Sequence, residues 1–164
     1  FNTSGYSSTT EYWALGRSNG SGSGFGFYKF GTNGNANCWD FYFGNYSLSQ
    51  ATQTVPGQWY HLAVSRDNST GRASFYINGT RVATSTSATG VDYSSSLYVG
   101  TFNGSSAYFP GYISDVRIVK GSYAYDPAST TLTVPTAPLT AVTNTKLLTN
   151  MTNAGIPDLS LIHI

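Results

Sequence analysis

The amino-acid sequence predicts an all-β fold, a β-sandwich or a β-barrel, on three observations. Apolar and polar residues alternate with a period of two in short runs that are rich in Tyr, Phe, Val and Ile. Gly and Asn separate these runs, as turn residues separate strands. No window repeats apolar residues at the i, i+3, i+4, i+7 spacing of an amphipathic helix. Several short strands at this spacing are typical of a sandwich or a barrel.

The runs give the strands that we expect, in chain order. They are Glu11–Leu15, Gly24–Phe30, Cys38–Phe43, Gln58–Arg66, Arg72–Ile77, Arg81–Thr84, Leu97–Phe102 and Tyr112–Val119.

The clearest local unit is a hairpin around Asn78-Gly79. These two residues tolerate the positive φ angles that a two-residue type I′ turn requires. A second turn precedes it at 68–71, so Gln58 to Ala83 is expected to form a three-stranded meander. Phe75 and Ile77 share one face of the first hairpin strand, and Val82 continues that face on the second.

Two of the expected strands carry apolar residues on both faces. In one, Tyr60, Leu62 and Val64 alternate with Trp59, His61 and Ala63. Tyr112–Val119 has the same character. Strands of this kind are typical of the centre of a sheet that is covered on both sides.

Composition excludes several classes of protein. The 164 residues suit one domain, with only 9% charged residues, 15% aromatic residues and a net charge of +1. A nucleic-acid binder needs a basic patch that this chain lacks. No apolar stretch approaches the roughly 18 residues of a membrane helix. Cys38 is the single cysteine, so it cannot form an internal disulfide, and a buried strand thiol is favoured over a reactive nucleophile.

Three motifs in order resemble laminin-G-like domains of the concanavalin A-like lectin/glucanase superfamily. They are the Trp59–Arg66 segment, the Phe75–Val82 hairpin and the Gly111–Ile118 segment, and their structural residues are Trp59, His61, Asn78, Gly79, Gly111 and Asp115. The resemblance implies an antiparallel jelly-roll sandwich. Members normally open with an aromatic-rich strand that does not precede Phe1, so one or two N-terminal strands are expected to be missing and a neighbouring edge exposed.

The resemblance also suggests domain boundaries. We expect the sandwich over 1–134, a Pro- and Thr-rich linker over 135–146, and the start of a following repeat over 147–158. The passage from Pro135 to Asn150 is similar to tandem copies in structural proteins of marine phages. Leu159–Ile164 matches the translation of a sequencing-library adaptor, so the sequence is expected to be a metagenomic fragment. A natural apolar strand end is the alternative.

The sequence argues against an enzyme, although the superfamily includes glucanases. Glycoside hydrolysis normally needs two carboxylates that flank the scissile bond, and no two of the seven acidic residues lie within five positions of each other. A Ser-His-Asp triad would have to use His61, which we expect to be a satisfied structural histidine. No catalytic residues are therefore predicted.

Binding residues are expected on loops. Asp92 and Asn103 flank the Leu97–Phe102 strand, and they could hold the calcium ion that laminin-G-like lectins commonly bind, although a hydrogen-bonded turn explains each equally well. We otherwise expect no cofactor and no metal. Sugar binding would use loop aromatics such as Tyr46, Tyr93 and Tyr108 with nearby amides; the alternative is that Tyr108 and Phe109 only cap the sandwich. The predicted ligand site is Asp92, Tyr93, Asn103 and Tyr108.

Two functions remain open. The first is a non-catalytic recognition module of a phage tail, a fibre or another surface protein, binding glycan or another cell-surface ligand. The second is a structural spacer or decoration domain of a virion, with protein-protein contacts to neighbouring repeats. The sequence predicts no nucleic-acid partner and no membrane span.

Overall fold

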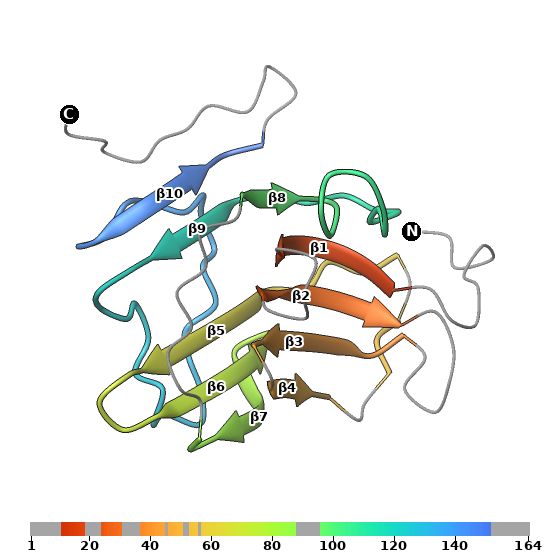
Figure 1. The fold of residues 1–164 in the computed structure, drawn as a ribbon. Coiled ribbons are helices and arrows are strands. Elements are labelled where there is room, and N and C mark those ends of the chain that lie inside the picture. The colour runs from red at the N-terminus through yellow and green to blue at the C-terminus, as the bar shows by residue number, and fades with distance from the viewer. Residues whose placement is uncertain are drawn as a thin grey trace.

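The computed structural model describes residues 11–18, 24–30, 37–44, 46–50, 53–55, 57–87 and 96–151. All regular structure within these ranges is β-strand, and the strands pair antiparallel (Figure 1). In this part of the chain no helix could serve as a membrane span. The all-β prediction is confirmed.

The strands form three sheets. A five-stranded sheet has the order β4-β3-β2-β1-β8, a three-stranded sheet has the order β5-β6-β7, and a two-stranded sheet pairs β10 with β9. The bounds are β1 Glu11–Ser18, β2 Gly24–Phe30, β3 Trp39–Phe43, β4 Tyr46–Ser49, β5 Leu62–Asp67, β6 Arg72–Ile77, β7 Thr80–Ser85, β8 Leu97–Val99, β9 Val116–Val119 and β10 Thr145–Thr149.

The main core lies where the five-stranded sheet faces the three-stranded sheet. Trp39, Phe41 and Leu48 come from the first sheet, and Phe75 and Ile77 come from the second. The Phe27 and Phe41 rings lie 4.9 Å apart, and Phe27 reaches Phe75 across the layers at 5.8 Å. This packing of two inner faces is that of a β-sandwich.

The meander is confirmed, including its turn. Asn78 and Gly79 have φ angles of 48° and 82°, the left-handed pair that a type I′ turn needs. Phe75 and Ile77 are buried in the core, and Val82 packs against it from β7.

The outer face of the meander is also covered. Ser74 and Tyr76 alternate with the core residues of β6 and are fully buried. The Ser74 hydroxyl donates to the Pro127 carbonyl at 2.7 Å, and the Tyr76 hydroxyl donates to the Ser129 carbonyl at 2.8 Å. The segment over 125–130 therefore forms a lid on this sheet.

Several strand predictions were wrong in extent. β5 begins at Leu62 rather than Gln58, and it lies at an edge of its sheet rather than at the centre. Trp59 consequently lies outside the strand with 67% of its surface exposed. β9 begins at Val116 rather than Tyr112, after Asp115 with a left-handed φ of 48°. β8 ends at Val99, before the left-handed Gly100.

Two strands differ from what the sequence predicts. Tyr46 was taken for a loop aromatic but begins β4, which pairs with β3. β10 pairs with β9 and buries Leu148, with 2% of its surface exposed. The division into sandwich, linker and following repeat stays a prediction, because a strand pair does not by itself mark a domain boundary.

Candidate functional site

The predicted ligand residues fall partly on one loop. Asp92 and Tyr93 lie outside the described residues. Asn103 and Tyr108 both belong to the segment over 100–110, which follows β8 and which we call the Tyr108 loop. The Tyr108 hydroxyl lies 3.4 Å from the Gly104 carbonyl, so the loop folds back on itself between the two residues.

Asn103 is engaged in a local turn. Its side-chain oxygen accepts hydrogen bonds from the Ser105 amide, the Ser105 hydroxyl and the Ser106 hydroxyl, each at 3.0 Å. An oxygen with three donors is poorly placed to ligate a cation as well. The hydrogen-bonded turn, one of the two alternatives at this position, describes Asn103. A calcium site that rests on Asp92 stays a prediction.

Tyr108 and Phe109 point in opposite directions. Phe109 packs against the core, with its ring 5.6 Å from that of Trp39, whereas Tyr108 leaves 60% of its surface exposed. Backbone bonds from Phe109 to the Gly100 carbonyl at 2.8 Å and from Trp13 to the Ala107 carbonyl at 3.1 Å hold the loop on the five-stranded sheet. Phe109 thus caps the sandwich, as one of the two alternatives from the sequence expected, while Tyr108 is exposed to solvent on a backbone held by hydrogen bonds.

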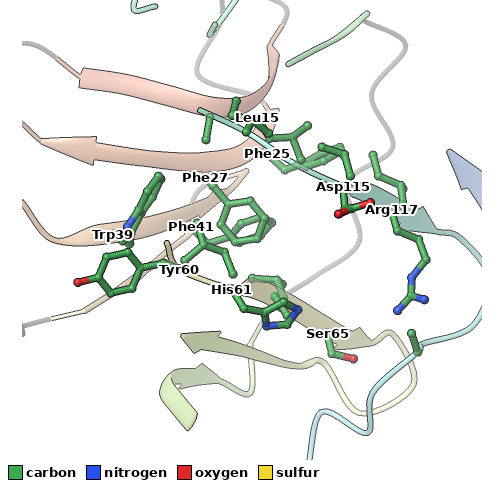
Figure 2. A pocket seen from close by; sticks show the side chains of 18 of the residues that line it. Leu15, Phe25, Phe27, Trp39, Phe41, Tyr60, His61, Ser65, Asp115 and Arg117 are labelled. Atoms are coloured by element: carbon green, nitrogen blue, oxygen red, sulfur yellow. The ribbon is translucent and has the colours of Figure 1, made fainter. Parts of the chain in front are cut away.

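A second feature is a groove of about 960 Å³ between the sheets, which the sequence analysis missed (Figure 2). Phe27, Phe41 and Trp39 of the five-stranded sheet line one side of it. β5 and the segment 112–119, which includes β9, line the other. The sequence feature that could have indicated the groove is the presence of apolar residues on both faces of these two strands.

His61 lies in the groove and is not the satisfied histidine that the sequence suggested. Its Nδ1 atom is buried without a hydrogen-bond partner among the described residues. Its ring meets that of Tyr125 edge-on at 6.5 Å. Burial, and then the nearby Arg117 cation, lower the pKa of His61 below its usual value.

Two further residues that line the groove carry an orphaned nitrogen. These nitrogens are Arg17 Nε and Trp39 Nε1, which are buried without a partner in the described part of the chain. All three orphaned groups of the groove are thus ring or guanidinium nitrogens, and two of them are obligate donors. Buried donors of this kind cost free energy unless an acceptor reaches them.

The rim of the groove carries exposed aromatics and the Gly111–Ile118 motif. Trp59 and Tyr112 are exposed over 67% and 81% of their surfaces. Asp115 accepts a hydrogen bond from the Ser114 hydroxyl at 3.0 Å. The Arg117 guanidinium donates to the Thr140 carbonyl at 3.0 Å. Gly111 sits in a turn, its amide bonded to the Phe109 carbonyl at 3.0 Å.

Of the acidic residues that the structure describes, Glu11 and Asp40 interact, because the Glu11 charge adds to burial, the larger cause, in raising the pKa of Asp40. Glu11 accepts a hydrogen bond from Trp13 Nε1 at 3.0 Å, and Asp40 is buried with the Gln50 amide on its carboxylate at 3.3 Å. Among the described residues no group of three His, Cys, Asp or Glu side chains could hold a metal ion. Burial raises the pKa of the Cys38 thiol, which opposes thiolate formation.

Comparison with known proteins gives one match. The sequence model of the family described as "Concanavalin A-like lectin/glucanases superfamily", a laminin-G-type family, matches residues 1–124. No curated protein and no solved structure matches the chain.

Proposed function

Since the chain belongs to the concanavalin A-like lectin/glucanase superfamily, we propose that it is a non-catalytic recognition module that binds glycans or other cell-surface ligands through the Tyr108 loop. Domains of this superfamily often bind carbohydrates or other ligands, and the laminin-G-like ones are generally non-catalytic. The specific ligand and the site are the proposal.

The observation that supports this site is the pairing of an exposed ring with a fixed backbone. An aromatic face covers the apolar face of a sugar, and a rigid side chain loses little entropy when it binds. Phe109 anchors the loop from below, so Tyr108 is held outward in the free protein.

Polar groups lie on the same loop as the ring. Ser105 and Ser106 are exposed, and their hydroxyls are oriented by Asn103. Because each of these hydroxyls donates its proton to Asn103, its oxygen is left to accept a hydrogen bond from a sugar hydroxyl. Asn103 therefore positions the acceptors of the site, and Asp92 and Tyr93 remain its predicted further members.

The wider setting that we propose is a larger phage tail, fibre or other surface protein, in which neighbouring repeats of the same chain are partners. This rests on the sequence resemblance of the 135–150 passage and on the surface composition, which is low in charge and rich in Tyr, Ser and Asn.

A glycan array tests the proposal. The 164-residue chain is applied with and without calcium, together with Tyr108→Ala and with Tyr123→Ala as a matched control, since Tyr123 is half-exposed on another segment. We expect binding by the chain and by the control, and at least a tenfold loss in Tyr108→Ala, because stacking contributes about 1–3 kcal/mol in comparable aromatic contacts.

The other outcomes decide between the alternatives. Binding that survives Tyr108→Ala and Asn103→Ala would refute this site. No binding in either buffer would favour a structural spacer domain of a virion. Release of sugar from the array would support a glycoside hydrolase, the least favoured function.

A further inference from the structure

Two Asn-Gly pairs lie in turns that the structure describes, and they differ in what holds the asparagine side chain. They are Asn78-Gly79 in the hairpin between β6 and β7, and Asn103-Gly104 in the Tyr108 loop. In such a pair the glycine nitrogen can attack the side-chain carbonyl carbon of the asparagine, because glycine has no Cβ atom to hinder the approach. The same reactive dipeptide therefore occurs in two different environments.

At Asn103 the side chain is folded over the backbone that follows it. Its Oδ1 atom accepts a hydrogen bond from the Ser105 amide at 3.0 Å. The ring that this bond closes contains both Asn103 Cγ and the Gly104 nitrogen, which are the two atoms that would join. The turn therefore keeps the electrophile and the nucleophile in one short closed segment, which favours their reaction.

The same oxygen carries two more hydrogen-bond donors. The Ser105 hydroxyl and the Ser106 hydroxyl each donate to it at 3.0 Å. Attack at Cγ turns this carbonyl oxygen into an oxyanion, and donors that already point at the oxygen stabilise the charge as it develops. The donors that build the turn at Asn103 thus also favour the attack.

The other groups of the reaction are open to solvent. Residues 103–106 are all exposed. Among the described residues, neither the Gly104 amide nor the side-chain nitrogen of Asn103 donates a hydrogen bond. A base in solution can therefore take the proton of the Gly104 amide, and the side-chain nitrogen is free to leave.

The fold favours glycine at position 104. Its φ is 82°, and a Cβ atom there would lie 2.8 Å from Tyr98 Cε1. A residue with a side chain would hinder the attack, but it would also strain this backbone. The loop therefore keeps the unhindered nitrogen next to Asn103.

Asn78 is held in the opposite way. Its Oδ1 atom accepts a hydrogen bond from the His61 amide at 2.9 Å, which draws the side chain toward the start of β5. Gly79 is buried, and its carbonyl accepts the Leu132 amide at 2.8 Å. The Gly79 nitrogen can reach Asn78 Cγ only when the hairpin opens locally.

We propose that Asn103 is a site of spontaneous deamidation, promoted by the hydroxyl donors on its side-chain oxygen. The Gly104 nitrogen loses its proton and bonds to Asn103 Cγ, and the Cγ–Nδ2 bond breaks to release ammonia and leave a succinimide. Water then adds to either carbonyl of the succinimide, and cleavage of the ring C–N bond gives aspartate or isoaspartate. Both products place a negative charge in the Tyr108 loop, where a neutral amide had oriented the Ser105 and Ser106 hydroxyls.

Peptide mapping by mass spectrometry tests the proposal on the 164-residue protein, stored at neutral pH and physiological temperature. Cleavage after Arg and Lys places the four Asn-Gly pairs of the sequence in four different peptides. We expect aspartate and isoaspartate to accumulate at position 103 about tenfold faster or more than at position 78, because the hairpin must open before Asn78 reacts. In urea, where both turns are lost, the two positions should react at similar rates.

Variants of the donors separate this reaction from the effect of exposure alone. Ser106→Ala should slow the conversion of Asn103 by about fivefold, since one hydrogen bond to the developing oxyanion is lost. Ser69→Ala, in the similar turn at Asp67, is the matched control and should leave the rate unchanged. Equal rates at positions 103 and 78 in the folded protein, or an unchanged rate in Ser106→Ala, would contradict the proposal. Because the test uses no ligand, its outcome is independent of the glycan array.

Discussion

At the scale of single residues, Gly79 shows how one position joins the hairpin to the end of the fold. Its φ is 82°, and a Cβ atom there would lie 2.7 Å from the Leu132 carbonyl oxygen. Leu132 is also hydrogen-bonded to the turn, because its amide donates to the Gly79 carbonyl at 2.8 Å. Any side chain must therefore strain the backbone and push the 130–132 segment away.

Gly57 supplies the matched comparison for a substitution at Gly79. Its φ is similar, at 78°, but a Cβ atom would meet nothing within 4 Å. We expect Gly57→Ala to cost about 1 kcal/mol from the left-handed backbone alone, and Gly79→Ala to cost about 2–4 kcal/mol. Urea unfolding measures both, and equal losses would show that the Leu132 contact contributes nothing.

Lys29 is a buried amine and makes stability depend on pH. It lies in β2 with 3% of its surface exposed and its Nζ 5.4 Å from the Trp39 ring centre. Burial lowers its pKa to about 8 from 10.5. Between these two values the unfolded chain binds more protons than the native one, so the free energy of unfolding rises as the pH increases above 8.

Replacing Lys29 by Met should remove this dependence. We expect Lys29→Met to raise the free energy of unfolding by about 1–3 kcal/mol at pH 7, because the cost of a buried charge disappears while the Trp39 contact is kept. The gain should shrink from pH 8 to pH 10. Tyr28, whose pKa burial raises to about 12, changes the curve only above that window. A loss of stability at pH 7 would mean that the cation contributes more than its burial costs.

At the scale of elements, the lid over 125–130 replaces a second layer on the outer face of the meander. Tyr76 is fully buried, and its hydroxyl donates to the Ser129 carbonyl at 2.8 Å with the Asp126 carbonyl at 3.2 Å. Ser65 and Ser74 donate to the Tyr125 and Pro127 carbonyls beside it. The lid is thus held by hydroxyl groups that alternate with core residues along β5 and β6.

Removing one hydroxyl measures this attachment. Tyr76→Phe should cost about 1 kcal/mol, since it removes the hydrogen bonding of a buried hydroxyl, while Arg81 still donates to the Ser129 carbonyl and the Ser129 amide still donates to the Asp126 carbonyl. Tyr60→Phe is the control, because the Tyr60 hydroxyl bonds to Val55 at an exposed position, and it should cost less than about 0.5 kcal/mol. Thermal or urea unfolding of the two variants checks the difference; an unchanged Tyr76→Phe protein would place the stability of the lid elsewhere.

The sequence predicted those elements whose structure is local. The β2 strand and the β6 strand have the predicted bounds, and the Asn78-Gly79 turn follows from the φ preferences of two adjacent residues. The prediction was wrong where the extent of a strand depends on its pairing with another strand. β5 begins at Leu62 because its partner β6 ends at Ile77, and β9 begins at Val116, opposite the end of β10 and after the left-handed Asp115. β4 is a short run whose apolar content is mostly Leu48 and Tyr46.

The candidate site shows the same division. Composition suggests that one aromatic residue of this loop reaches solvent. Whether Tyr108 or Phe109 faces outward depends on the contact between Phe109 and Trp39, which are far apart in the sequence. The hydrogen-bonded turn at Asn103 is local, and it is one of the two alternatives that the sequence predicts there. The groove was not predicted, because it arises from three sheets placed together and leaves no motif in any one segment.

At the scale of the whole molecule, the fold separates two surfaces. The Tyr108 loop lies on the five-stranded sheet, fixed by Trp13 and Phe109. The groove lies between β5 and β9, and three of the residues that line it carry a buried nitrogen without a hydrogen-bond partner among the described residues. A family in which domains often bind ligands supplies the reason to expect recognition, and we propose the Tyr108 loop as its site.

The central claim is that surface ligands meet the Tyr108 loop and not the groove. It is tested most directly by mapping amide chemical shifts of the 164-residue protein by NMR during titration with a glycan that binds on the array. We predict that the largest shifts cluster at residues 103–108 and vanish in Tyr108→Ala, while the amides of Leu62, Val64 and Val116–Val119 stay in place. Shifts centred on β5 and β9, with the Tyr108 loop unmoved, would contradict the account.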